Sequence, residues 1–144
     1  MNTEVAFKIV DVDGEAWYEL TKPLVCLQTG IQSYNFRNEV INLAIDGCLI
    51  LSKGFWWDGR SGPALDTVNT LRSSAFHDAL YELIIIAVLP KSVRVLADIL
   101  MRKIDKEDGV NFIRRWYSHV GLRLFGRGKK KRDYVERKII REAG

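Results

Sequence analysis

The stretch Gly54–Pro63, with the sequence GFWWDGRSGP, divides the chain into two parts of different hydrophobic periodicity. Before it, apolar residues occur in short, β-prone runs. After it, they recur with the spacing of a helix. The stretch itself is rich in glycine and ends in proline, a composition typical of a loop. We therefore expect an α+β fold, in which a small N-terminal antiparallel sheet ends at this loop and helices then pack on one face of the sheet.

Working back from the loop, two Asp-Gly pairs and one proline organise the predicted strands. Asp13-Gly14 and Asp46-Gly47 are strong hairpin signals. Pro23 indicates an edge strand or a break, because proline cannot donate to a sheet ladder. The predicted strands are Val5–Val10, Trp17–Leu20, Leu24–Leu27, Val40–Ile45 and Cys48–Leu51.

Working forward from the loop, the pattern predicts three to four helices. The first begins at Ser73 or Ser74, because serine is a favoured N-cap, and runs to about Leu89, where Pro90 ends it. The second carries the apolar positions between Val93 and Ile104. Asp108 would cap a third helix that stops at Gly126, and a fourth would run from about Lys130 to Arg141. We expect residues 1–126 to form one α+β domain and residues 127–144 to form a basic helical tail.

Composition places the chain among soluble globular proteins, since 47% of its residues are hydrophobic and 28% are charged. A length of 144 residues suits one domain.

The first residues lack the pattern of a signal peptide, and the longest apolar run, Leu83–Leu89, is far shorter than the roughly 20 residues of a membrane span. Cys26 and Cys48 have no metal-site spacing, which favours reduced thiols in a cytoplasmic setting.

The positive charge of the chain is concentrated near its C-terminus. Residues 127–142 contain eight basic and three acidic side chains, a net charge of +5, whereas the whole chain has a net charge of +4. The remainder is therefore slightly acidic, at −1. A solvated helix face is the simpler interpretation of this segment. The alternative is a surface that binds nucleic acid or an acidic partner through Lys129, Lys130, Lys131 and Arg132.

Two polar clusters contain most of the residues able to do chemistry. Asp58 lies in the loop and can be a base, a metal ligand or simply a turn residue. His77 and Asp78 lie in the first turns of the first predicted helix, with Tyr81 one turn further on the face of His77. His77 can be a general base or a ligand for a divalent metal ion, or half of a buried His-Tyr pair.

Two further residues have a supporting place in this hypothesis. Asp98 is four residues after Arg94, a spacing typical of a helical ion pair. Ser61 could act as a nucleophile only with His77 as its base, and no nucleophile-elbow motif surrounds it. The chain also has no phosphate-binding P-loop, no dinucleotide motif and no HExxH zinc motif, so these enzyme classes are not indicated.

The order of these clusters resembles a protein family of tailed bacteriophages and prophages that is catalogued as a domain of unknown function. The resemblance spans roughly Trp17 to Gly126. Its motifs are Gly54-Phe55-x-x-Asp58-Gly59-x-Ser61-x-Pro63, Ala75-x-His77-Asp78-x-Leu80-Tyr81 and Arg94-x-x-Ala97-Asp98. Trp56, Trp57 and Arg60 stand where that family usually has small or apolar residues. The resemblance implies a phage or prophage source and a polar set of Asp58, Ser61, His77, Asp78 and Asp98, and it implies no activity.

Two functional hypotheses follow. The first is a non-catalytic virion-associated or assembly component, in which Asp58, His77, Asp78 and Asp98 form a buried polar network between loop and helix. Its partners would be other phage proteins, with nucleic acid as a further partner of the basic tail, in the host cytoplasm or in the virion. The alternative is a small hydrolase-like or metal-assisted enzyme with Asp58, His77 and Asp78 as its active site. The first is favoured, because the set has few metal ligands and no clear nucleophile.

Overall fold

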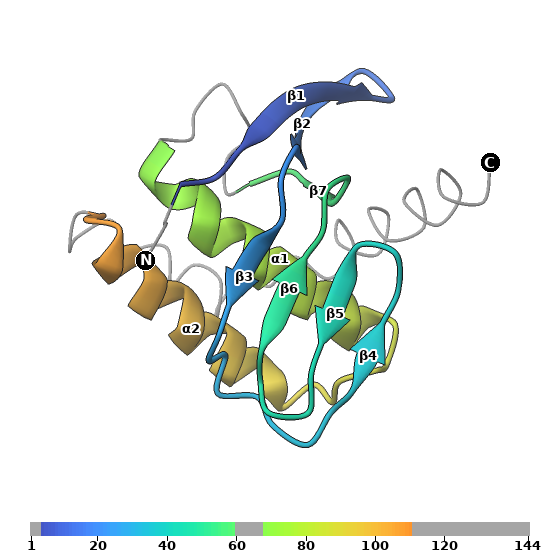
Figure 1. Ribbon diagram of the computed structural model, residues 1–144, viewed down its shortest axis with the longest axis vertical. Coiled ribbons are helices and arrows are strands. Elements are labelled where there is room, and N and C mark those ends of the chain that lie inside the picture. Colours follow the sequence, from blue (N-terminus) through green and yellow to red (C-terminus); the bar gives the residue numbers. More distant parts are fainter. Residues whose placement is uncertain (1–3, 60–67, 111–144) are drawn as a thin grey trace.

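The computed structural model describes residues 4–59 and 68–110, and Figure 1 shows how their elements are arranged. Strands occupy the first part of the chain and helices the second, so the α+β prediction is confirmed. The elements are β1 (Phe7–Val12), β2 (Glu15–Leu20), β3 (Leu24–Cys26), β4 (Phe36–Arg37), β5 (Ile41–Leu43), β6 (Leu49–Leu51), β7 (Trp56–Trp57), a 3₁₀ turn (Val68–Thr70), α1 (Leu71–Ile85) and α2 (Val93–Glu107).

The strands form two antiparallel sheets where the sequence predicts one. The first has the order β1-β2-β7 and the second the order β3-β6-β5-β4. Figure 1 shows α1 passing behind the four-stranded sheet, with α2 alongside α1 and the β1–β2 hairpin extending away from both. The helix α1 contacts β6, β7 and α2, so it lies between the sheets and the second helix.

Both Asp-Gly hairpin signals are confirmed. The β1–β2 hairpin turns at Asp13 and Gly14, each with a positive φ, as the favoured hairpin turns require. The β5–β6 hairpin turns at Asp46 and Gly47. The sequence did not predict the short strands β4 and β7, each of two residues, because so short a segment has no measurable alternation.

The helix α1 is buried along most of its length. Every residue from Leu71 to Leu83 is buried, including charged and polar ones. Phe76 and Leu80 pack with Leu49 and Leu51 of β6 and with Trp57 in one core, and each of these side chains is fully buried. A helix covered on several sides is not limited to a single apolar stripe. The function of its polar residues therefore depends on how they are paired inside the protein.

Two predictions about the helices are wrong. The helix α1 begins at Leu71 after Thr70, so Ser73 and Ser74 do not cap it. Both serines lie inside the first turn, where the Ser74 hydroxyl donates to the Leu71 carbonyl and the Ser73 hydroxyl donates to Asp105 while lying 3.1 Å from the carbonyl oxygen of Thr70. The helix also ends at Ile85, well before Pro90, because the chain turns at Ala87, which has a φ of 64°.

The predicted number of helices is not supported either. Residues 4–59 and 68–110 contain two α-helices, and not the three to four that the pattern indicates. Asp108 is the C-cap residue of α2 where the sequence predicts an N-cap. The remaining predicted helices, and the proposed domain boundary at Gly126, lie outside the described residues.

We predict that a side chain at Gly47 in the β5–β6 turn destabilises the protein more than a side chain at Gly14 in the β1–β2 turn. This residue has a φ of 94°, and an added Cβ would lie 3.2 Å from the backbone oxygen of Ile31. Gly14, with a φ of 83° and nothing within 4 Å of a Cβ, is a matched control. Both alanine variants should lose about 1 kcal/mol from backbone strain, and Gly47→Ala should lose at least about 1 kcal/mol more from the steric contact. Urea unfolding measures the difference, and equal losses would contradict the role assigned to the contact.

Candidate functional site

His77, Tyr81 and Asp98 form a buried cluster between α1 and α2. The Nε2 atom of His77 lies 2.8 Å from Oδ1 of Asp98, and the Tyr81 hydroxyl donates to the same oxygen at 2.8 Å. The His77 and Tyr81 rings, four residues apart on α1, have centroids 4.1 Å apart, so the predicted pairing of these rings is present. His77 is 2% exposed, Asp98 3% and Tyr81 6%. One carboxylate of α2 is therefore a shared partner for two side chains of α1.

Tyr81 also contacts a cation of α2. The guanidinium carbon of Arg94 lies 5.7 Å from the centre of the Tyr81 ring, within the range of a cation–π interaction. Burial and the hydrogen bond to Asp98 raise the pKa of Tyr81 to about 12, although Arg94 acts in the opposite direction. The phenol therefore stays neutral at physiological pH and remains a hydrogen-bond donor to Asp98.

At the other end of the helix pair, Arg72 is held by two acidic residues. Its Nη2 atom lies 2.7 Å from Glu107, and its Nε atom lies 3.0 Å from Asp108. The adjacent Ser73 donates a hydrogen bond to Asp105, which is 1% exposed. Burial lowers the pKa of Arg72, but the bonds to Asp108 and Glu107 outweigh it, so the pKa lies above the ordinary arginine value.

These contacts make a continuous feature that we name the α1–α2 polar interface. It consists of Arg72, Ser73, His77 and Tyr81 paired with Asp98, Asp105, Glu107 and Asp108. Contacts early in α1 are made with the end of α2, and later contacts with its beginning, as in an antiparallel helix pair. The interface holds the two helices in one register.

A second polar contact joins α1 to the sheet. The indole Nε1 atom of Trp57 donates to the Ser74 hydroxyl at 3.0 Å, and that hydroxyl donates in turn to the Leu71 carbonyl. Asp78 lies one turn after Ser74 on α1 and is 2% exposed. Asp58 directly follows Trp57 and is partly buried. A hydrogen bond from Trp57, which the sequence pattern did not indicate, thus joins β7 to α1.

The structure divides the predicted site residues between two sides of α1. His77 and Asp98 meet on the side of α2, whereas Ser74 contacts Trp57 of β7, which Asp58 follows. The ring of His77 is still near Asp78, with 3.9 Å between Nδ1 and Oδ1. Ser61 and the basic residues Lys129, Lys130, Lys131 and Arg132 lie outside the described residues.

Sequence reasoning missed Arg72, Ser73, Ser74 and Asp105 as parts of the network. A signal was present in the spacing. Asp98 and Asp105 are seven residues apart, which places two carboxylates on one side of the same helix. Ser73, His77 and Tyr81 are four residues apart in succession, which places three polar groups on one side of the other helix. Complementary polar rows on two consecutive helices predict that these rows face each other.

The chemistry available to this arrangement is limited by access. A general base must reach a substrate proton at hydrogen-bond distance, and the side chain of His77 is 2% exposed. Within residues 4–59 and 68–110, no three His, Cys, Asp or Glu side chains are grouped so that they could hold a metal ion. The arrangement is well suited to joining two helices through charged and neutral hydrogen bonds.

Comparison with protein-family models, with curated proteins and with solved structures returned no match. Among the described residues, neither helix combines the length and the apolar character needed to cross a membrane.

We predict that Ser74→Ala destabilises the protein by about 1–3 kcal/mol, because the buried Trp57 indole loses its acceptor. Ser52→Ala is the matched control, since Ser52 is only partly buried and forms its sheet contacts through the backbone. Urea unfolding of both variants measures the effect. A loss no larger than that of the control would mean that the Trp57–Ser74 bond contributes little to joining sheet and helix.

We also predict a stability change at alkaline pH that depends on Tyr81. Its pKa is about 12 in the folded protein and about 10 in an unfolded chain, so the folded state favours the protonated phenol. This contribution is complete below about pH 10 and is lost as the pH rises toward 12. The stability difference between the wild type and Tyr81→Phe should therefore shrink by about 1 kcal/mol between about pH 9 and about pH 11.

Tyr34→Phe, at a partly buried tyrosine outside the interface, is the control for this measurement. Chemical denaturation at each pH gives the three curves. If the difference between wild type and Tyr81→Phe stays constant while the pH rises, the hydrogen bond from Tyr81 to Asp98 does not contribute as described.

Proposed function

We propose that this chain is a phage-encoded, non-catalytic virion-associated or assembly component, in which buried polar contacts fix the relative positions of two helices and a sheet. The observation that carries the proposal is the burial of His77, Asp78 and Asp98, each between 2% and 3% exposed. An active site needs solvent-accessible groups, whereas a network that holds a framework together needs sealed ones.

The paired contacts support the same role. Every residue of the α1–α2 polar interface that lies on α1 has a partner on α2 or in Asp108, the C-cap residue of α2. Most of these pairs join a carboxylate to a hydroxyl or an imidazole. Such pairs are costly to break and favour one arrangement of the helices. A protein that must present the same surface in many copies of an assembly benefits from this rigidity.

One feature of the proposal concerns residues outside the described part. The basic residues Lys129 to Arg132 would contact another phage protein or nucleic acid. We place the protein in the host cytoplasm during assembly or in the virion.

The direct test is quantitative mass spectrometry of mature particles and of assembly intermediates from the phage or prophage that encodes the chain. The proposal expects this chain at a fixed ratio to a major structural protein in one of these fractions. Absence from both fractions, together with abundant protein in the lysate, would contradict it.

A second experiment separates the structural role from the enzyme alternative. We predict that the phage yield supported by His77, Tyr81 or Asp98 variants follows their free energy of unfolding. His77→Ala should lose about 2–4 kcal/mol, from the cavity and the lost bond to Asp98. Leu43→Ala, a fully buried position in the sheet, is a control of similar cost.

On the structural account, His77→Ala and Leu43→Ala reduce the yield to a similar extent when their stabilities are similar. A His77 variant that is as stable as the wild type and yet supports no phage growth would favour a catalytic function for the histidine.

A further inference from the structure

The outward side of α2 has two parts of different chemistry. Its first half exposes three apolar side chains, with Val95 and Leu96 each 41% exposed and Ile99 51% exposed. Its second half exposes Arg102, Lys103 and Lys106. Glu107, which is paired with Arg72, is the one exposed acidic residue of α2, because Asp98 and Asp105 point into the α1–α2 polar interface. We name the set Val95, Leu96, Ile99, Arg102, Lys103 and Lys106 the helix surface.

A groove borders the helix surface. It has a volume of about 300 Å³ and lies between β3 and α2, where its lining includes Leu27, Leu100, Lys103 and Glu107. Leu27 is 64% exposed. An apolar strip beside a groove, with cations at one end, can accept an apolar side chain that has acidic neighbours.

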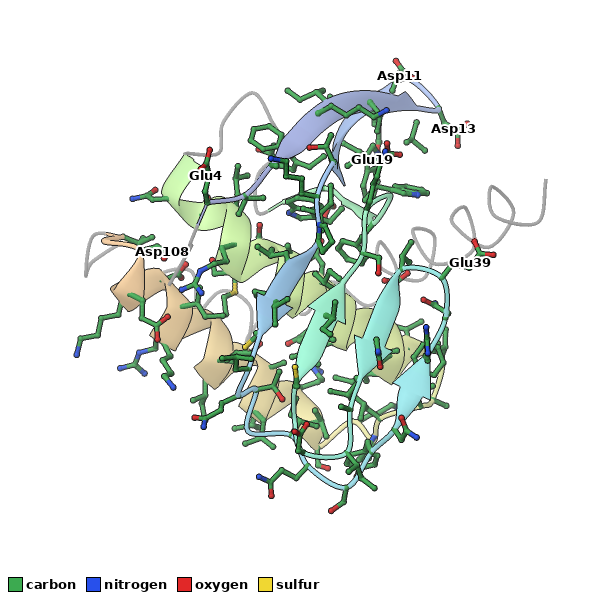
Figure 2. All side chains as sticks on the ribbon, in the orientation of Figure 1. Glu4, Asp11, Asp13, Glu19, Glu39 and Asp108 are labelled. Carbon is green, nitrogen blue, oxygen red and sulfur yellow. The ribbon has the colours of Figure 1, made fainter. Side chains whose placement is uncertain are left out.

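The β1–β2 hairpin carries the opposite chemistry. Ile9 is 57% exposed on β1, and Asp11, Asp13 and Glu15 are exposed around the turn. Figure 2 shows Asp11 and Asp13 at the tip of the hairpin, pointing away from the protein. Lys8, the one basic residue of the hairpin, forms an ion pair with Glu19 at 3.2 Å. We name the set Ile9, Asp11 and Asp13 the hairpin surface, because Ile9 and Asp11 share one face of β1 and Asp13 lies in the adjoining turn.

The position of the two surfaces decides which partner fits. The hairpin tip and α2 lie on opposite sides of the described structure, so one copy cannot bring them together (Figure 1). Two hairpin surfaces facing each other would oppose acids to acids, and such a pairing is unfavourable. The hairpin surface of one copy against the helix surface of a second copy pairs unlike charges and places Ile9 against the apolar strip.

We propose that this protein binds a second copy of itself head to tail, with the hairpin surface of one copy seated on the helix surface of the next. Contacts of this type repeat along a ring or a filament, because each copy keeps one unused surface of each kind. The inference is independent of the proposed function: a protein that remains monomeric could still be a particle component, and an enzyme could also assemble in this way.

The experiment uses two full-length variants, each with one surface disabled. Ile9→Asp alters the hairpin surface and Ile99→Asp alters the helix surface; Ile45→Asp, at an isoleucine that is 66% exposed and belongs to neither surface, is the control. Circular dichroism and thermal unfolding confirm that all three are folded. Analytical ultracentrifugation over a range of concentrations then measures the association of the wild type, of each variant, and of equimolar mixtures.

The wild type and Ile45→Asp should form a series of oligomers that weakens as the salt concentration rises from about 0.05 M to about 0.5 M. Each surface variant alone should associate at least about tenfold more weakly, because a buried isoleucine is replaced by a charge. A mixture of the two surface variants should form one-to-one dimers and nothing larger, since each partner retains a different intact surface.

Three results would overturn the proposal. The first is a wild type that stays monomeric at low salt and high concentration. The second is a loss of association in only one of the surface variants, which would indicate that the intact surface pairs with itself or with another segment. The third is a mixture that fails to form dimers although both variants are folded.

Discussion

The structure depends on the burial of α1. A helix that is covered from Leu71 to Leu83 cannot leave its polar side chains to water, and an unpaired buried polar group costs about 1–3 kcal/mol. The chain meets this constraint by supplying partners from both neighbouring layers. Carboxylates of α2 and its C-cap pair with Arg72, Ser73, His77 and Tyr81, and on the sheet side the Trp57 indole bonds to Ser74. Of the polar residues singled out in the sequence, His77 and Asp98 are partners in this pairing.

This constraint also explains how the sheet and the helices are joined. The aromatic residues of the loop before α1 are part of the core, with Phe55 and Trp57 stacked at 5.9 Å between ring centres and both fully buried. Trp57 is also in β7, which pairs with β2 and so attaches the β1–β2 hairpin to the core. A single short segment therefore contributes a strand, a packed aromatic ring and a hydrogen bond to α1.

The sequence predicted the features that depend on local signals. The Asp13-Gly14 and Asp46-Gly47 turns, the order of strands before helices and the contact of His77 with Tyr81 were all readable, because each rests on neighbouring residues. Three features could not be predicted from the sequence: the start of α1, the strand β7 and the pairing of Ser73 with Asp105. Each depends on which element packs against which: Ser73 has the composition of a cap, and only the position of α2 makes it an interior donor. His77 and Asp98 were singled out as candidate site residues, but their shared burial is a property of the packed helices and not of the local sequence.

The central claim is that Asp98 is the acceptor on which the middle of the α1–α2 polar interface depends. The most direct measurement is the free energy of unfolding of Asp98→Ala by urea denaturation. The account predicts a loss of about 3 kcal/mol or more, because His77 and Tyr81 lose a common buried partner at the same time. A loss below about 0.5 kcal/mol, the size expected for a surface substitution, would contradict it.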